Sequence, residues 1–284
     1  MKLKHPLPKL FCHAVLIGGS LVCLFPLVWM ALTSLKPIDE TMTMPPTWLP
    51  SIFEWDNYPK AVLYQREKLG YIPFLRYFLN TLYLVMMTVP GVLLSNALVA
   101  YGFARIKWRG RETLFALTLA TMMIPFPVTM VPMYVLFKHL HWIGTFKPLW
   151  VGAWFGGAFN IFLLRQFFRS IPEELSDAAR VDGASEFRIF WQIILPLAKP
   201  ALAVVALFHF MYVWNDFMGP LIYLQDQSQF TLALGLQAYQ SQHGGTEWNM
   251  LMAAATIMVT PVIVLFFFTQ KTFIQGITVT GLKG

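Results

Sequence analysis

Apolar runs of about twenty residues recur along this chain, and they constrain its fold more than any other feature. The first extends from about Phe11 to Leu32, which is long enough to cross the roughly 30 Å hydrocarbon core of a bilayer as a helix. The whole chain is 57% hydrophobic and only 12% charged, a composition typical of a membrane protein. A single water-soluble core is therefore excluded.

The runs predict an all-α membrane protein in which residues 1–284 form one transmembrane domain. A signal peptide is the alternative for the first run, but its apolar region is shorter and ends in small residues at a cleavage site. The first run is therefore interpreted as a membrane span. The six predicted spans cover residues 11–32, 77–104, 114–137, 149–168, 200–214 and 250–269.

The third predicted span contains Pro125, Pro127 and Pro132. Each proline lacks a backbone donor, so this span is expected to bend, which a membrane helix tolerates only where protein or water replaces the lost hydrogen bonds. Two interpretations remain open. The bend is part of a gate or substrate path, or it belongs to a packing helix that is merely bent.

The distribution of positive charge predicts the orientation in the membrane. Six spans place both termini on one side, and the termini, the turn 105–111 and the segment 165–199 together carry two thirds of the 21 Lys and Arg residues. The segment 215–247 carries none. Because cytoplasmic loops are enriched in Lys and Arg, the termini, the turn and the segment 165–199 are predicted to be cytoplasmic.

Residues 170–196 form the longest polar segment with a regular pattern. Ser170 and Glu173 have the spacing of a capping box, and Pro172 is tolerated in a first helical turn, so a helix is predicted to begin here. One face of that helix carries small, apolar and acidic side chains at helical spacing. They are Leu175, Ala178, Ala179 and Asp182.

Gly183 is predicted to end this helix and to act as a hinge, in a conformation that only glycine adopts cheaply. A second stripe with helical spacing follows, and Pro196 interrupts it. Taken alone, the pattern also fits a polar loop with two amphipathic helices on a membrane surface. The second stripe consists of Phe187, Phe190, Trp191 and Ile194.

Three residues separate Asp177-Ala178-Ala179 from Gly183, and nine further residues lead to Ile193-x-Leu195-Pro196. This spacing closely resembles the EAA loop of permease subunits of ATP-binding-cassette importers. Asp177 stands where the motif usually has Glu, which keeps the charge but shortens the reach. The resemblance implies that the segment forms coupling helices that sit in a cleft on a cytoplasmic ATPase. The implied coupling residues are Glu174, Asp177, Ala178, Ala179, Asp182, Gly183, Ile193, Leu195 and Pro196.

Further matches in chain order resemble carbohydrate permeases of the maltose-system type, in particular the second of their two unlike membrane subunits. The resemblance implies a bacterial cytoplasmic (inner) membrane complex with a second, unlike permease, two cytoplasmic ATPase subunits and an extracytoplasmic solute-binding protein. The C-terminal tail is a candidate to reach into the ATPase pair. The matches are Asn80-Thr81, Trp214-Asn215-Asp216-Phe217, Pro220-Leu221, Thr246-Glu247-Trp248-Asn249, Gln275-Gly276 and Gly281-Leu282-Lys283-Gly284.

The chain lacks the motifs of nucleotide-binding and catalytic proteins. It has no G-x-x-x-x-G-K-[ST], H-E-x-x-H or G-x-S-x-G. ATP and Mg are therefore expected on the partner ATPase, and no enzyme activity, bound cofactor or metal is predicted for this chain. Its basic residues form no stripe with interleaved aromatics, so no nucleic-acid partner is predicted either, whereas membrane lipid is.

Polar side chains at membrane depth are candidates for the solute path, because their burial in lipid is costly. Aromatic neighbours such as Trp154 and Phe155 suit the face of a sugar ring. Hydrogen bonding between helices explains such residues equally well, and the partner permease is an alternative source of the sugar contacts. The candidates are Asn96, Asn160, His209, Tyr212, Trp214 and Asn215.

The leading hypothesis is an importer permease for a sugar or oligosaccharide that performs no covalent chemistry itself. A permease for glycerol phosphate or another polyol is the alternative within the family. A secondary transporter would need internal repeats and carboxylates inside the spans for coupling ions, and the sequence offers neither. A membrane-embedded enzyme would need a clustered catalytic set, and only separated Asn and His residues are present.

Overall fold

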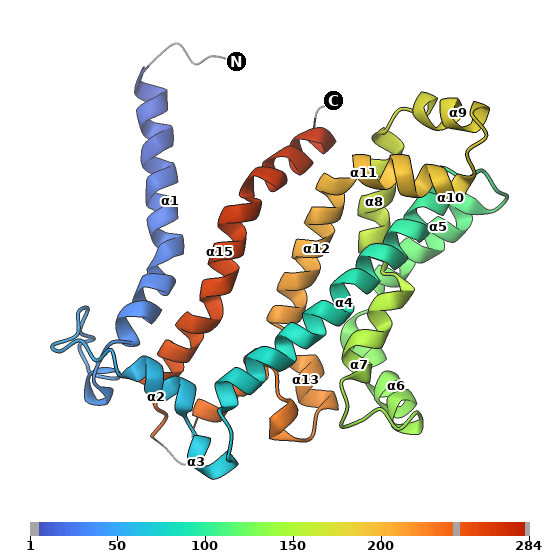
Figure 1. Ribbon diagram of the computed structural model, residues 1–284. Coiled ribbons are helices and arrows are strands. Elements are labelled where there is room, and N and C mark those ends of the chain that lie inside the picture. Colours follow the sequence, from blue (N-terminus) through green and yellow to red (C-terminus); the bar gives the residue numbers. More distant parts are fainter. Residues whose placement is uncertain (1–5, 241–244, 282–284) are drawn as a thin grey trace. The chain divides into compact units, whose positions relative to one another are not determined.

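The computed structural model describes residues 6–240 and 245–281, and every regular element within these two ranges is helical (Figure 1). The predicted all-α fold class is therefore confirmed. Three helices are long and apolar enough to cross a membrane. They are α1 (Pro6–Thr33), α4 (Pro73–Ala104) and α15 (Trp248–Gly281), and they coincide with the first, second and sixth predicted spans.

The third predicted span is sharply bent, as its prolines indicate. It consists of α5 (Arg111–Ala120), a 3₁₀ turn (Thr121–Met123) and α6 (Phe126–His139), and the two parts form an angle of 96°. Pro125 precedes α6 in an extended conformation, and Pro127 lies in the first turn of α6, where its missing N–H has no helical acceptor to lose. The break therefore lies at the prolines.

The fourth predicted span, 149–168, is not one continuous helix, so this prediction is wrong in its geometry. A short helix, α7 (Lys147–Trp150), and a 3₁₀ turn (Val151–Phe155) end at Gly156, whose φ is +83°, and α8 (Ala158–Ser170) follows. A left-handed glycine cannot continue a right-handed helix. By length and composition the described residues contain three candidate spans, or up to five if each bent pair is one span, so six spans remain a prediction.

The fifth predicted span corresponds to α12 (Lys199–Trp214), which is bent by 77° relative to the short helices before it. Pro200 lies in its first turn. The helix ends at Trp214, as predicted. The remaining short elements outside the segment 170–198 are η1 (Ile38–Glu40), α2 (Asn57–Leu63), α3 (Arg66–Leu69), α13 (Met218–Tyr223), η5 (Gln227–Gln229), α14 (Leu232–Gly235) and η6 (Leu236–Tyr239).

The chain divides into two compact units, and the first comprises residues 1–75 and 235–261. Its centre is the fully buried amide of Asn57, which donates to the carbonyl oxygens of Ser34 and Lys36 at 3.0 Å each. The Asn57 oxygen accepts a hydrogen bond from Asn249 at 3.1 Å. One side chain thus joins the end of α1, the start of α2 and the start of α15.

The side chain of Tyr239 offers a test of packing in the first unit. Its hydroxyl donates to the Ala61 carbonyl at 2.7 Å, and its ring stacks on Tyr64 at 4.8 Å between centroids. Tyr239→Phe is expected to destabilise the protein by about 1 kcal/mol, because the Ala61 carbonyl loses one of its two donors and keeps only the Tyr64 backbone N–H at 3.2 Å. Tyr64→Phe keeps the stacked rings and serves as the control in thermal unfolding in detergent. Equal melting temperatures for both variants would contradict the prediction.

The second unit comprises residues 76–234 and 262–284 and has a continuous apolar core. The core lies where α4, α5 and α8 pack against the helices of segment 186–205. The side chains at its centre, which have no exposed surface, are Ala100, Leu164, Phe168, Ile189, Ile194, Ala198 and Val205. This core holds the polar segment 170–196 against the end of α4.

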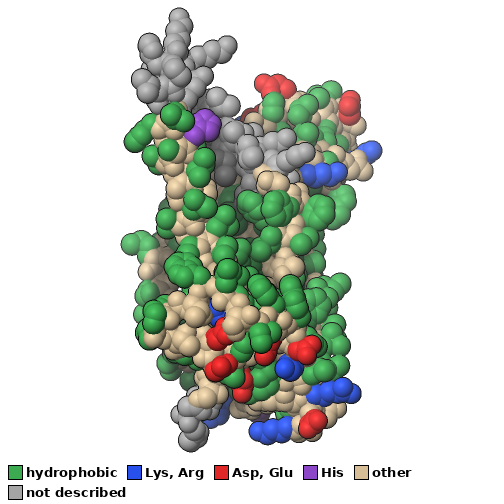
Figure 2. All heavy atoms as spheres, turned by 90° about the vertical axis from the view of Figure 1, so that its left-hand side faces the viewer, with side chains coloured by type: hydrophobic (Ala, Val, Ile, Leu, Met, Phe, Trp, Pro, Cys, Tyr) green, Lys and Arg blue, Asp and Glu red, His purple; other side chains and the backbone are tan. Residues whose placement is uncertain are grey.

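Much apolar surface stays exposed, as expected for a chain that lies in lipid or against other subunits. The most apolar stretch of α1 buries none of its residues, and Leu16 and Val22 are 67% and 73% exposed. Figure 2 shows many hydrophobic side chains on the visible surface, and charged side chains gather in the lower part of the view. The exposure agrees with the predicted membrane location.

Candidate functional site

The polar segment 170–196 folds as two short helical pieces joined at a glycine, which confirms that prediction. The first piece is α9 (Glu174–Val181). The second runs without interruption through α10 (Glu186–Ile189), a π-helical turn (Phe190–Ile194) and α11 (Leu195–Leu197). Gly183 lies between them with a φ of +78°, in the left-handed region that disfavours every residue with a Cβ. We call residues 174–197 the elbow.

The predicted capping box at the start of α9 is wrong. Ser170 is the last residue of α8, and its hydroxyl donates back to the Phe167 carbonyl at 2.7 Å. Pro172 disfavours a helical conformation at Ile171, which is extended, so the chain leaves α8 before α9 begins. Glu173 precedes α9 without a side-chain cap. The second piece does have one, because the Ser185 side chain accepts from the backbone of Arg188.

The second predicted stripe does not form one buried face. Phe187 and Trp191 are exposed and stacked on each other at 6.3 Å, whereas Phe190 and Ile194 are buried. Phe190 packs 5.1 Å from the ring of Tyr101 in α4. The exposed pair begins three residues before the buried pair. Only the buried pair is covered, on the side that faces α4.

The nine predicted coupling residues are distributed over both pieces of the elbow and the glycine between them. A hollow of about 250 Å³ lies between its two pieces, and three of these residues, Ala179, Asp182 and Ile193, contribute to its lining. Both pieces thus present coupling candidates to one concave surface. Of the nine, Glu174, Asp177, Ala178, Asp182, Gly183 and Pro196 are exposed, and Ala179, Ile193 and Leu195 are partly buried.

A chain of charged hydrogen bonds connects the elbow to α4. The Arg180 guanidinium donates to Asp177 at 2.6 Å and to Glu186 at 2.7 Å, and the Tyr101 hydroxyl donates to the other Glu186 oxygen at 2.5 Å. The bond from Arg180 holds the pKa of the Glu186 carboxyl below its usual value. Glu186 therefore joins both pieces of the elbow to α4.

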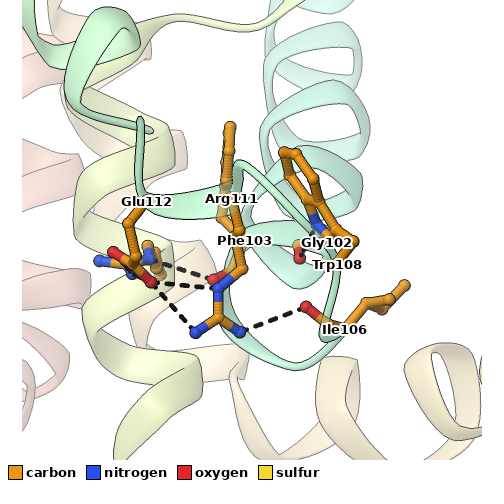
Figure 3. A network of polar contacts seen from close by, with 7 residues as sticks. Gly102, Phe103, Ile106, Trp108, Arg111 and Glu112 are labelled. Atoms are coloured by element: carbon orange, nitrogen blue, oxygen red, sulfur yellow. Dashed lines mark hydrogen bonds and ion pairs between the residues drawn. The ribbon is translucent and has the colours of Figure 1, made fainter. Parts of the chain in front are cut away.

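The turn between α4 and α5 is held by a second polar network (Figure 3). Arg111 donates to the Ile106 carbonyl at 3.2 Å and to Glu112 at 3.1 Å, and the Trp108 indole donates to the Gly102 carbonyl at 3.2 Å. These bonds fold residues 102–112 back on themselves. The basic turn is thus a defined structure at the end of α4.

Arg165 of α8 completes this network from inside the core. Its Nη2 donates to both carboxylate oxygens of Glu112 at 2.8 and 2.7 Å, and its Nε donates to the Phe103 carbonyl at 3.2 Å. The guanidinium also lies 3.9 Å from the centre of the Phe115 ring. One buried arginine therefore joins α4, α5 and the helix that leads into the elbow.

Asn96, a candidate for the solute path, is fully buried, and both ends of its amide are occupied. Its oxygen accepts from the backbone of Gly157 at 2.7 Å, and its nitrogen donates to the Val92 carbonyl at 2.7 Å. These contacts fit hydrogen bonding between helices, the alternative that the sequence leaves open. Asn96 caps the chain where α8 begins.

The other candidates lie on α8 and α12. His209 and Tyr212 stack at 5.9 Å, and Phe208 packs 6.4 Å from Phe159, which brings the neighbours of Asn160 and His209 together. Trp214 is buried against the ring of Phe210 at 5.1 Å, and exposed Asn215 donates to the Met211 carbonyl at 2.8 Å. Asn160 is partly buried. The structure thus brings His209 and Tyr212 together, and Asn96 binds the backbone of Gly157, three residues before Asn160.

Metal binding has no candidate in residues 6–240 and 245–281, where no group of three or more His, Cys, Asp and Glu side chains is arranged to hold an ion. The C-terminal match Gly281 through Gly284 falls largely outside the described residues.

Comparison with known proteins places the chain among transporters. The family described as "Binding-protein-dependent transport system inner membrane component" matches residues 96–279. The arabinooligosaccharides transport system permease protein AraQ of Bacillus subtilis (strain 168) is 34% identical over 93% of this chain and 92% of its own length. The sn-glycerol-3-phosphate transport system permease protein UgpE of Yersinia pestis bv. Antiqua (strain Antiqua) is 30% identical over 94% and 95%.

A solved structure shares the fold. A bacterial ABC transporter involved in the import of the acidic polysaccharide alginate aligns with a TM-score of 0.80 at 23% identity, over 95% of this chain and 99% of that one. The resemblance seen in the elbow and in the shorter motifs is thereby confirmed at the level of the family. This chain belongs to the binding-protein-dependent transport system inner membrane components, which are transport subunits and not enzymes.

Proposed function

We propose that this chain is the permease subunit of an ATP-binding-cassette importer that moves a sugar or oligosaccharide across a bacterial inner membrane. The observation that carries the coupling role is the elbow: two helical pieces around a left-handed Gly183, with Ala178 and Asp182 exposed. Its spacing is that of the EAA loop. The sugar assignment is supported by the 34% identity to a permease named for arabinooligosaccharides.

The proposed complex contains a second, unlike permease, two cytoplasmic ATPase subunits that bind ATP and Mg, and an extracytoplasmic solute-binding protein. The family description supports the binding protein. The elbow and both termini face the cytoplasm in this proposal, because the positive charge gathers there. This chain converts movement of the ATPase pair into movement of its own helices, and it binds no cofactor.

Import of glycerol phosphate is the second candidate, because UgpE covers this chain almost as fully at 30% identity. The two candidates differ in charge. A glycerol phosphate is an anion and a neutral oligosaccharide is not, so a cation on the solute path would favour the former.

Reconstitution of the complex tests the function directly. The permease pair, the ATPase and the binding protein are copurified, and the solute held by the binding protein is identified by mass spectrometry. Vesicles are then assayed for ATP-dependent uptake of that solute. Uptake of an oligosaccharide together with stimulated ATP hydrolysis is expected. Uptake without the ATPase, or driven by an ion gradient, would contradict the proposal.

The orientation is tested at Gln229, which lies in the segment 215–247 that lacks Lys and Arg. Gln229→Cys, made after Cys12 and Cys23 are replaced by Ser, is expected to react with an impermeant thiol reagent added from outside. A cysteine in the elbow at Val181, which is 88% exposed, is the matched site and should react only after the cytoplasmic side is opened. The reverse pattern would invert the topology.

His209 tests the solute path. Its Nε2 is buried and has no hydrogen-bond partner among the described residues. No hydrogen bond to the protein therefore explains why this nitrogen is buried. His209→Leu is expected to reduce uptake about fivefold, the equivalent of one hydrogen bond, with assembly intact. His209→Gln should retain more activity. Unchanged uptake kinetics in both variants would leave His209 as a packing residue.

A further inference from the structure

A second hollow lies behind the elbow, at the end of α4. Its volume is about 300 Å³, and it is enclosed by the start of the basic turn on one side and by α9 and Glu186 on the other. The side chains that matter here are Arg105, Lys107, Glu173 and Ser176. None of these four belongs to the predicted coupling set, but Asp177, which also lines the hollow, does.

Two buried side chains in this hollow have polar atoms without partners. Arg105 is 8% exposed, and its Nη2 donates to the Ile171 carbonyl, but its Nε and Nη1 have no acceptor among the described residues. The hydroxyl of Ser176 is 1% exposed and equally unsatisfied. Buried donors of this kind are costly unless an acceptor reaches them. These donors therefore have no acceptor among the described residues, although Glu173, Asp177 and Glu186 also line the hollow.

The acidic side chains around the hollow accept no hydrogen bond from these donors of Arg105 and Ser176. Asp177 and Glu186 are engaged by Arg180 at 2.6 and 2.7 Å, and Glu186 also accepts from Tyr101. Glu173 acts on Arg105 through its charge but makes no hydrogen bond with it. The free donors of Arg105 and the nearby charge of Lys107 remain available to an oxyanion.

The hollow lies next to the end of a candidate membrane span. Arg105 directly follows α4, a candidate span that ends at Ala104, and the same turn carries Lys107 and Arg109. Trp108 of this turn is 41% exposed beside them, as is common for tryptophan at a membrane–water interface. Basic pockets next to membrane helices on the cytoplasmic side hold anionic headgroups.

From this arrangement we propose that the hollow lined by Arg105, Lys107 and Ser176 binds the phosphate group of an anionic phospholipid. The phosphate oxygens accept from Arg105 Nε and Nη1 and from the Ser176 hydroxyl, and Lys107 contributes charge. Because Ser176 lies in α9, the bound lipid holds the elbow against the end of α4. The site goes beyond the proposed function, since it takes a component of the membrane and not the solute.

The binding is measured on the purified complex by native mass spectrometry after delipidation, with titration of phosphatidylglycerol, phosphatidylcholine or inorganic phosphate. Wild type is expected to retain phosphatidylglycerol in preference to phosphatidylcholine. Arg105→Gln, whose amide keeps one donor, and Ser176→Ala should each lower this retention at least fivefold. Arg109→Gln removes the same charge from the same turn at an exposed position, and it should leave the retention of phosphatidylglycerol unchanged.

Equal loss in Arg105→Gln and Arg109→Gln would mean general attraction to charge and would overturn the site. Unchanged retention in both Arg105→Gln and Ser176→Ala would overturn it as well. Displacement of the lipid by millimolar inorganic phosphate would identify a free anion as the ligand and refute the lipid. Because retention is counted without solute or ATP, these results stand apart from the outcome for sugar import.

Discussion

Gly183→Val is expected to give a permease that inserts and pairs normally but loses about 90% of its solute-stimulated ATP hydrolysis. Gly183 has a φ of +78°, and a Cβ built there meets no atom within 4 Å. The substitution therefore causes no clash, and its cost is the left-handed backbone itself, about 1 to 2 kcal/mol and more for a β-branched side chain. The elbow relieves this strain by changing the angle between its two pieces.

The matched control for Gly183→Val is Gly110→Val. Gly110 has a φ of +84° and equally open surroundings, but it lies in the basic turn before α5 and outside the elbow. Both variants carry the same backbone strain. Copurification of the ATPase and solute-stimulated hydrolysis in vesicles separate them, because only Gly183→Val should fail. Equal loss in both variants would show that strain anywhere in the unit is enough.

The substitution Ala179→Trp tests the elbow through the volume of the side chain. Ala179 is partly buried and lines the hollow of the elbow together with Asp182 and Ile193. A tryptophan at this position fills the concave surface, so a docked subunit is excluded whatever the backbone does. The two substitutions thus distinguish a change in the angle of the elbow from a blocked surface.

The parts of this structure that were predicted correctly depend on local pattern. The C-terminal ends of α1, α4 and α12 coincide, to within one residue, with the predicted ends of the apolar runs. The left-handed conformation at Gly183 follows from a glycine between two amphipathic stretches. The predicted cap at Ser170 failed for a local reason as well. Pro172 acts on the residue before it, and this effect outweighs a two-residue match to a capping box.

The contacts that build the site were not predictable, because they join residues far apart in the chain. Tyr101 and Glu186 are 85 positions apart, and Asn96 and Gly157 are 61 apart. The sequence singles out Asn96 as a polar side chain in a predicted span, and the structure shows it fully buried within the protein. Its partner, a backbone N–H freed by the glycines at the start of α8, leaves no periodic signal.

Arg165→Ala is expected to destabilise the permease by about 2 to 5 kcal/mol, the range for truncating a long buried side chain. Arg165 is 3% exposed, and its guanidinium lies 3.9 Å from the centre of the Phe115 ring, which belongs to the apolar core. The truncation leaves a cavity and removes the donor for the Phe103 carbonyl. It also leaves Glu112 paired with Arg111 alone, so the turn between α4 and α5 loses these hydrogen bonds to α8.

Arg169→Ala is the matched control for Arg165→Ala, since it removes the same residue type one turn later on α8 at an exposed position. It should change stability by less than about 0.5 kcal/mol. Arg165→Met separates the two causes, because it keeps most of the buried volume and removes the charge and the hydrogen bonds. Thermal unfolding of the detergent-solubilised complex should therefore rank the variants as Arg169→Ala, Arg165→Met and Arg165→Ala in order of increasing loss of stability.

If Arg165→Met were as unstable as Arg165→Ala, polar contacts and not volume would dominate at this position. If Arg165→Ala were as stable as Arg169→Ala, the network in Figure 3 would not hold α8 against the turn, and the support of the elbow would have to come from Tyr101 and Glu186 alone.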